Sequence, residues 1–264
     1  MSRPHFPPGT ASRYNYSISF KNLPDNFSGF KIAHISDPHS KPARGILEII
    51  KDASPDITVI TGDLLNDDEK TTTQVDELIA SLVGISPVYF ISGNHDLWRM
   101  DHRDIFRKYE DMGAVFMDNK TVIIERNGEK IGISGAPDPF SRLPESIFEN
   151  TKKSLEALEK IDGFNILLFH RANLFEQIKT YGYDLILSGH MHGGQIRIPK
   201  LGGILAPSSA ILSGTRMLFP KYTGGTIADN ETTMVVNRGV GNTLPLPRLG
   251  NAPEVGIITL SKDR

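Results

Sequence analysis

Short apolar runs alternate with segments of helical periodicity over the first hundred residues. The predicted strands are 14–20, 31–36, 57–61 and 88–92; the first alternates like a half-buried strand and the others read as buried. Helices are predicted at 44–53 and 71–84, and in the second Val75, Leu78, Ile79 and Leu82 fall on one face. The strand-helix-strand-helix-strand order from 31 to 92 predicts a parallel sheet covered by helices, an α/β fold.

The rest of the chain also contains both predicted helices and predicted strands. Helices are predicted at 102–111, 145–160 and 173–180, strands at 165–170, 184–190, 232–237 and 254–260, and a hairpin at 122–134. The hairpin turn falls at Asn127-Gly128, a pair that suits a two-residue turn. There is no internal repeat and no convincing linker, so we expect a single domain over 13–264 after a loose, Pro/Gly/Ser-rich segment at 1–12.

Composition narrows the class of protein. The 29 basic and 31 acidic residues give a net charge of -2, which argues against a broad nucleic-acid surface, and no nucleic-acid partner is expected. The absence of cysteine excludes disulfides, thiolate metal sites and cysteine nucleophiles. No apolar run approaches the roughly 20 residues of a membrane span, and 1–17 is not a signal peptide. We therefore expect a cytoplasmic protein; peripheral membrane association, or loss of a native anchor, is the alternative.

Polar clusters follow the carboxyl ends of the predicted strands, the edge at which open α/β sheets bind ligands. The clusters are Asp37-Pro38-His39, Gly62-Asp63, Gly93-Asn94-His95-Asp96, His170 and Gly189-His190-Met191-His192. Imidazole, carboxylate and amide oxygen together are the ligands of divalent Mn, Fe, Zn or Ni, whereas calcium and magnesium prefer more oxygen. A carboxylate such as Asp63 can bridge two cations, and a metal pair can activate a shared water against phosphorus.

The five clusters, in this order, resemble the calcineurin-like metallophosphoesterase family, whose pattern is D-x-H, G-D, G-N-H-D/E, H and G-H-x-H. The resemblance spans about 31–193 and implies a four-layer α/β/β/α sandwich with two divalent ions as cofactors. It implies that one ion is held by Asp37, His39, Asp63 and His192, and the other by Asp63, Asn94, His170 and His190. It also implies that His95 faces the substrate and assists the leaving group, with Asp96 holding the His95 ring.

A narrower resemblance extends to the C-terminus. The stretches GHMHGGQIRIP (189–199) and 237–260 are similar to the YkuE- and YaeI-type phosphodiesterases. This implies hydrolysis of a phosphodiester or pyrophosphate bond in a small substrate, with a metal-bridging hydroxide as nucleophile. One alternative is a lipid pyrophosphatase of the UDP-2,3-diacylglucosamine type working at a membrane surface, and another is a non-catalytic, metal-stabilised binding module.

Several residues outside the clusters allow two interpretations. His34 lies inside a buried strand and is expected to be a hydrogen-bonded core histidine. Trp98 either packs beneath the motif turn, which we favour, or forms a wall of the substrate cleft. Three arginines near the clusters could contact a second phosphate substituent or could be solvated: Arg171, Arg197 and Arg238. The apolar segment 201–222 is expected to be an irregular covering loop, with a lid or lipid-contacting patch as the alternative.

Overall fold

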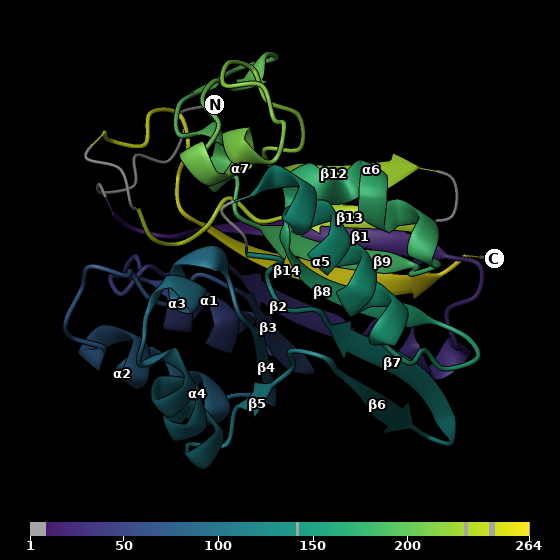
Figure 1. Cartoon of the computed structure of the whole chain (residues 1–264). Coiled ribbons are helices and arrows are strands. Elements are labelled where there is room, and N and C mark those ends of the chain that lie inside the picture. Colours follow the sequence, from purple (N-terminus) through teal and green to yellow (C-terminus); the bar gives the residue numbers. More distant parts are fainter. Residues whose placement is uncertain (1–8, 141–142, 230–231, 243–245, 264) are drawn as a thin grey trace.

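Two six-stranded sheets packed face to face form the centre of the molecule (Figure 1). The structure is a computed structural model that describes residues 9–140, 143–229, 232–242 and 246–263. The first sheet has the order β1 (Ser12–Phe20), β14 (Glu254–Lys262), β2 (Lys31–Ile35), β3 (Ile57–Thr61), β4 (Val88–Ile91) and β5 (Val115–Phe116). Strands β2 to β5 are parallel, and β14 runs antiparallel to β2 but parallel to β1. The predicted β-α-β-α-β unit is therefore correct.

The second sheet comes from the later part of the chain. Its order is β12 (Gly225–Asp229), β13 (Thr232–Val236), β9 (Leu185–Gly189), β8 (Asn165–Arg171), β7 (Glu129–Gly135) and β6 (Lys120–Arg126). The four central strands are parallel, while β6 and β12 pair antiparallel at the two edges. The predicted hairpin is β6–β7, and its turn residues Asn127 and Gly128 have φ values of 50° and 83°, as a type I′ turn requires.

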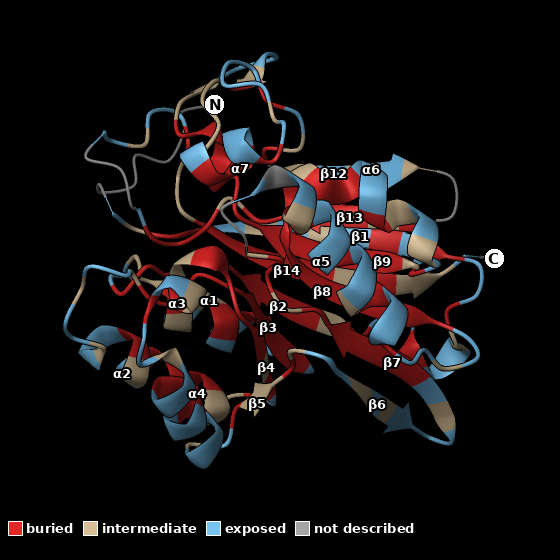
Figure 2. Ribbon diagram, in the orientation of Figure 1, coloured by how far each residue is buried: buried red, intermediate tan, exposed pale blue. Residues whose placement is uncertain are grey.

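Helices cover the outer face of each sheet. On the first sheet lie α1 (Ile46–Ala53), α2 (Thr73–Val83) and α4 (His102–Asp111); on the second lie α5 (Pro144–Ala157) and α6 (Phe175–Ile178). One buried apolar cluster fills the space between the sheets, and a further cluster fills each helix–sheet interface, which Figure 2 shows as buried ribbon. The chain is thus an α/β/β/α sandwich, as the resemblance implied. Among the described residues no helix is long and apolar enough to cross a membrane.

Some short elements differ from the sequence prediction. The segment predicted as one helix at 173–180 is three pieces: a 3-10 turn at Ala172–Leu174, α6, and a 3-10 turn at Lys179–Tyr181. Two five-residue helices and an edge strand were not predicted: α3 (Asn94–Trp98), α7 (Ser208–Leu212) and β12. Further short elements are 3-10 turns at Asp25–Phe27 and His192–Gly194 and the two-residue strands β10 (Arg197–Ile198) and β11 (Gly202–Gly203).

The predicted loose segment at 1–12 lies mostly outside the described residues. Where the structure begins, the chain is already anchored: the N–H of Ala11 donates to the carbonyl of Arg44 at 2.8 Å, and β1 starts at Ser12.

Candidate metal centre

Most of the candidate ligands sit on sharp backbone reversals directly after the strands, whereas His170 lies within β8 and Asn94 begins α3. Five of the seven have left-handed φ values, which non-glycine residues rarely adopt: Asp37 (53°), His39 (49°), Asp63 (51°), His190 (71°) and His192 (47°). Such conformations cost about 1–3 kcal/mol each and persist only where the surroundings impose them. Here the surroundings are backbone hydrogen bonds between neighbouring reversals, such as those from the Asp37 N–H to the Gly62 carbonyl and from the His39 N–H to the Asp63 carbonyl.

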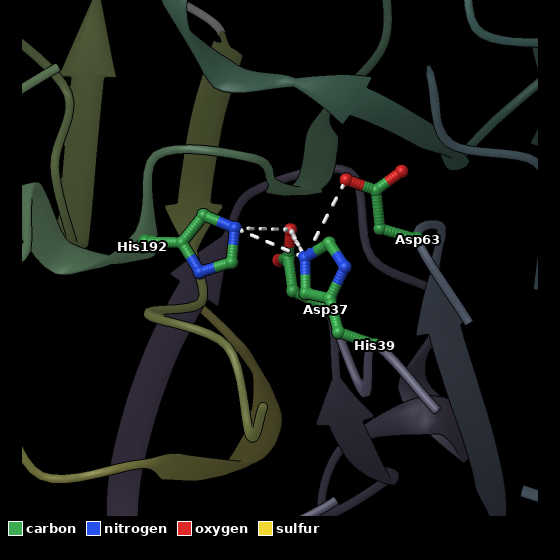
Figure 3. A group of neighbouring side chains, drawn as sticks. All are labelled: Asp37, His39, Asp63 and His192. Carbon is green, nitrogen blue, oxygen red and sulfur yellow. Dashed lines mark hydrogen bonds and ion pairs between the residues drawn. The ribbon is translucent and has the colours of Figure 1, made fainter. Parts of the chain in front are cut away.

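Four of these side chains converge in one group, shown in Figure 3. Ligand atoms of Asp37, His39, Asp63 and His192 all lie within 4.8 Å of one another, and all four residues are buried. The two imidazole Nε2 atoms of His39 and His192 are 3.1 Å apart, and the Asp37 Oδ1 atom lies 3.5 Å from the Nε2 of His192. Nitrogen and oxygen atoms directed at one small volume are the arrangement that a cation needs.

A second group shares Asp63 with the first. It consists of Asp63, His170 and His190, again with ligand atoms within 4.8 Å. The Nδ1 of His190 lies 3.2 Å from the Nε2 of His170. The Oδ2 atom of Asp63 is 3.2 Å from the Nε2 of His170 and 3.7 Å from the Nε2 of His39, so one carboxylate oxygen lies between the two groups.

Asn94 supplies an independent observation that a metal fits. Its side chain is fully buried, and neither its Oδ1 nor its Nδ2 has a hydrogen-bond partner among the residues that the structure describes. An unpaired buried amide costs about 1–3 kcal/mol in proteins, so such a group calls for a missing partner. A cation at the second group would give the amide oxygen that partner.

Outer hydrogen bonds orient two of the histidines for this role. The Nδ1–H of His170 donates to the carbonyl of Thr61 at 2.7 Å, and the Nδ1–H of His39 donates to the Oδ1 of Asn66 at 2.9 Å. Both bonds use Nδ1 and leave Nε2 as the atom directed at its group. Metal-binding histidines in proteins are usually fixed in this way by their second nitrogen.

The family comparison agrees with this geometry. The model for "Calcineurin-like phosphoesterase" matches residues 30–194. The chain belongs to the calcineurin-like phosphoesterase family. It is therefore a metal-dependent phosphoester hydrolase.

Relatives of this phosphoesterase cover most of its length. The metallophosphoesterase YkuE of Bacillus subtilis is 30% identical over 258 residues, covering 93% of this chain and 84% of that protein. Phosphodiesterase YaeI of Escherichia coli is 25% identical over 267 residues, 96% of this chain and 89% of YaeI. The narrower resemblance to these two proteins is confirmed. Among solved structures, the sulfate thiohydrolase SoxB of Thermus thermophilus matches 90% of this chain and 57% of its own with a TM-score of 0.50 at 14% identity, which supports the fold alone.

Charges inside the phosphoesterase site set the protonation of its side chains. Burial opposes the ionisation of Asp63, but the neighbouring His170 and His95 hold its pKa well below the usual range, and Asp37 beside His192 is shifted in the same direction. Burial lowers the pKa of His192 to about 3, whereas for His170 the opposing effect of Asp63 and Asp37 prevails over burial and raises the pKa to about 10. Cation binding at His170 would therefore release a proton.

His95 contacts a carboxylate other than the predicted one. Its Nδ1–H donates to the Oδ1 of Asp67 at 2.8 Å, and the predicted contact with Asp96 is wrong. Successive residues of a helix point about 100° apart, so in α3 Asp96 faces inward while His95 faces the cavity. Asp67 lies in the loop after Asp63, and no motif or periodicity predicted its contact with His95.

Asp96 has a structural position beneath the site. Its buried carboxylate accepts the backbone N–H groups of Gly93 (2.9 Å), Leu65 (2.9 Å) and Leu64 (3.2 Å). Burial, together with the charge of Asp63, raises the pKa of Asp96 to about 7. Asp96 thus caps the first turn of α3 and ties it to the loop that follows Asp63, and it holds His95 only through the backbone.

All three arginines contact other residues of the protein, and Arg171 is buried. Arg171 is 2% exposed and forms a paired contact with Asp138, Nε to Oδ2 at 2.8 Å and Nη2 to Oδ1 at 2.9 Å. Arg197 donates to the backbone carbonyls of Gly193 and Thr223, and Arg238 donates to the hydroxyl of Tyr14 and lies over its ring. The guanidinium groups of these arginines are thus engaged by other residues of the protein.

The structure also places His34, Trp98 and the segment 201–222, for which the sequence allowed two interpretations. His34 is fully buried and hydrogen-bonds through Nε2 to the Thr61 hydroxyl at 2.9 Å, which confirms the core assignment. Trp98 is 37% exposed and lines two cavities, so it is a wall of the cleft and the favoured packing role is wrong. The segment 201–222 includes α7 and forms the lobe around α7 at the top of Figure 1, and its residues Leu205 and Pro207 line the cavity that contains Asp63 and His190.

Proposed function

We propose that this phosphoesterase holds two first-row divalent ions and hydrolyses phosphodiester or pyrophosphate bonds in a small substrate. The observation that carries the proposal is the Oδ2 atom of Asp63, which lies between His39 and His170 and so between the two groups. In this assignment Asp37, His39, Asp63 and His192 hold one ion, and Asp63, Asn94, His170 and His190 the other.

The chemistry that such ions supply is a water of low pKa beside neutralised phosphate oxygens. The chain provides rigid positions for them, because the ligands are buried and five of the seven are held on strained reversals after the strands. The cavity that opens on Asp63, His190 and His192 also exposes His95 and has a volume of about 180 Å³. A phosphate group bound there would lie beside residues of both metal groups and beside His95.

His95 is proposed to donate a proton to the leaving oxygen. Its ring centroid is 4.9 Å from that of His39, and its Nδ1–H is engaged by Asp67. The Asp67 carboxylate fixes the ring through Nδ1, so that Nε2 is available to the substrate. This replaces Asp96 by Asp67 as the residue that orients His95.

The test compares single variants on an aryl phosphodiester in the presence of Mn²⁺, Zn²⁺ or Ni²⁺. We expect His95→Ala to reduce kcat by about 100-fold or more while the protein still binds metal, since general acids contribute roughly 10²–10⁴. Asp63→Asn should remove activity and lower the bound metal. His102→Ala is the matched control, because His102 contacts only the Arg99 carbonyl among the hydrogen bonds assigned to it and lines neither cavity. Full kcat in His95→Ala would show that the role is wrongly assigned.

A second candidate function is hydrolysis of a lipid-linked pyrophosphate at a membrane surface. The lobe exposes Leu201 (64%), Met217 (57%), Leu218 (49%) and Phe219 (55%), and residues 196–224 contain four basic residues and no acidic one. An apolar surface with basic residues suits an anionic bilayer. Co-sedimentation with phosphatidylglycerol vesicles should capture the protein, and Phe219→Asp should reduce the bound fraction. No binding to either anionic or neutral vesicles would remove this candidate.

A further inference from the structure

A second, larger cavity adjoins the metal-facing one. Its volume is about 480 Å³, within the range of small-molecule sites, and it shares Trp98 and Ser209 with the smaller cavity. The two spaces are therefore neighbours along one cleft, and a phosphate group in the smaller cavity could extend a substituent into the larger one.

Apolar and polar side chains share the walls of the larger cavity. The apolar ones are Leu97, Trp98, Phe140, Ile147 and Leu212, and the polar ones are Asp67, Arg171 and Ser209. The rings of Trp98 and Phe140 stand edge to face, with centroids 6.1 Å apart. Such rings bind flat or chain-like apolar groups with little loss of their own freedom.

The charged groups that reach this cavity are already paired. Arg171 is held by both oxygens of Asp138, and that ion pair is buried. Asp67 accepts the His95 ring and so lies at the end of the cavity nearest the chemistry. The Arg171 guanidinium is therefore not a free site for an anion, whereas an apolar ligand would bury the five apolar side chains.

Trp98 connects the two spaces. Its ring centroid is 4.3 Å from that of His95, and it lines both cavities. A substituent attached to the oxygen that His95 protonates would therefore leave the smaller cavity along the Trp98 ring.

We propose that the larger cavity binds an apolar substituent of the phosphoester substrate, either an aryl ring or an acyl chain. This rests on the proposed function for the position of the phosphate, but the cavity is tested by binding alone. Substrates with such a substituent would gain up to about fourfold in affinity for each methylene buried.

The test uses four phosphonates that cannot be hydrolysed: methyl-, butyl-, octyl- and benzylphosphonate, titrated calorimetrically into the full chain loaded with Zn²⁺. We expect octylphosphonate to bind at least about tenfold more tightly than methylphosphonate. Trp98 is the only tryptophan of the chain, so its fluorescence should shift to shorter wavelength with the octyl or benzyl compound and not with the methyl compound. Tighter binding of benzyl than octyl would identify an aryl substituent, and the reverse an acyl chain.

A matched pair of leucines locates the binding. Leu212 lines the cavity and is 55% exposed, whereas Leu218 lies on the same lobe, is 49% exposed and lines neither cavity. We expect Leu212→Ala to weaken octylphosphonate about three- to tenfold, with methylphosphonate unchanged, and Leu218→Ala to change either by less than twofold.

Three results would overturn the proposal: equal affinity for the methyl and octyl compounds, an equal effect of the two leucine variants, or no binding of the octyl compound. Hydrolysis of an aryl phosphodiester by the same preparation is measured separately. Activity without chain-length dependence refutes the cavity assignment alone, and chain-length dependence without activity refutes the proposed function alone.

Discussion

The buried pair of Arg171 and Asp138 makes a strong prediction about stability. Their side chains are 2% and 0% exposed and are joined by hydrogen bonds of 2.8 and 2.9 Å, so solvent does not screen the interaction. Arg171→Met leaves the Asp138 carboxylate buried without its cation. Breaking a buried pair in this way costs about 3–5 kcal/mol, a large part of the 5–15 kcal/mol that holds a typical domain together. The melting temperature should fall by roughly 6–20 °C.

The assay is urea unfolding of the metal-free protein, followed by circular dichroism. Asp138→Leu should destabilise the protein by a similar amount, because it leaves the guanidinium unpaired. The double variant Arg171→Met/Asp138→Leu should cost less than the sum of the singles by about 2 kcal/mol or more, since no charge then remains buried. Lys152→Met is the surface control: Lys152 pairs with Glu156 at 3.8 Å in solvent and should cost under about 1 kcal/mol. Additive effects, or a cost under 1 kcal/mol for Arg171→Met, would refute the reasoning.

Three further predictions concern the site and its surroundings. Asp67→Asn should lower kcat about 10- to 100-fold with metal content unchanged, measured by steady-state kinetics and metal analysis; a wild-type rate would exclude its positioning role. Burial lowers the pKa of His34 to about 3, so the unfolded chain binds an extra proton between that value and about 6.5. The contribution of His34 to stability is thus full above pH 6.5 and falls below it. Between pH 7.5 and 5.5 the free energy of unfolding of the wild type, measured in urea, should fall by about 1.4 kcal/mol more than that of His34→Gln. Equal losses in the two proteins would contradict this. Zn²⁺ at 100 times its dissociation constant should stabilise the protein by about 2.7 kcal/mol in thermal unfolding, and Asp63→Asn should abolish the gain; an unchanged gain would contradict the shared-ligand assignment.

The sequence predicted the central strands and the candidate ligands because both rest on local signals. Buried strands such as 57–61 are largely apolar runs, and every polar cluster lies at or directly after the carboxyl end of a strand. In a parallel sheet those strand ends meet at one edge, so the convergence of Asp63, His170 and His190 follows from the strand order.

What the sequence could not predict depends on short elements and on contacts between loops. The helix α3 has five residues, too few for a helical period to appear, and without it the directions of His95 and Asp96 could not be separated. The Asp67 contact is made across 28 positions of sequence by a loop without periodicity. The arginine partners are equally remote: Asp138 lies 33 residues from Arg171, and pattern reasoning has no access to such pairs.

The position of β14 has a consequence for how the molecule is made. This strand lies between β1 and β2, so the first strand of the chain has no partner until one of the last has been synthesised. The candidate metal centre also depends on residues that are synthesised late, because the N–H of Gly241 donates to the carbonyl of Asp37. A chain emerging from the ribosome could assemble β2, β3 and β4. Strand β1 would stay unpaired, with exposed backbone groups, until β14 has been made. Release of the C-terminal region is therefore the step that closes the first sheet, and a nascent chain stalled before residue 254 should depend on chaperones.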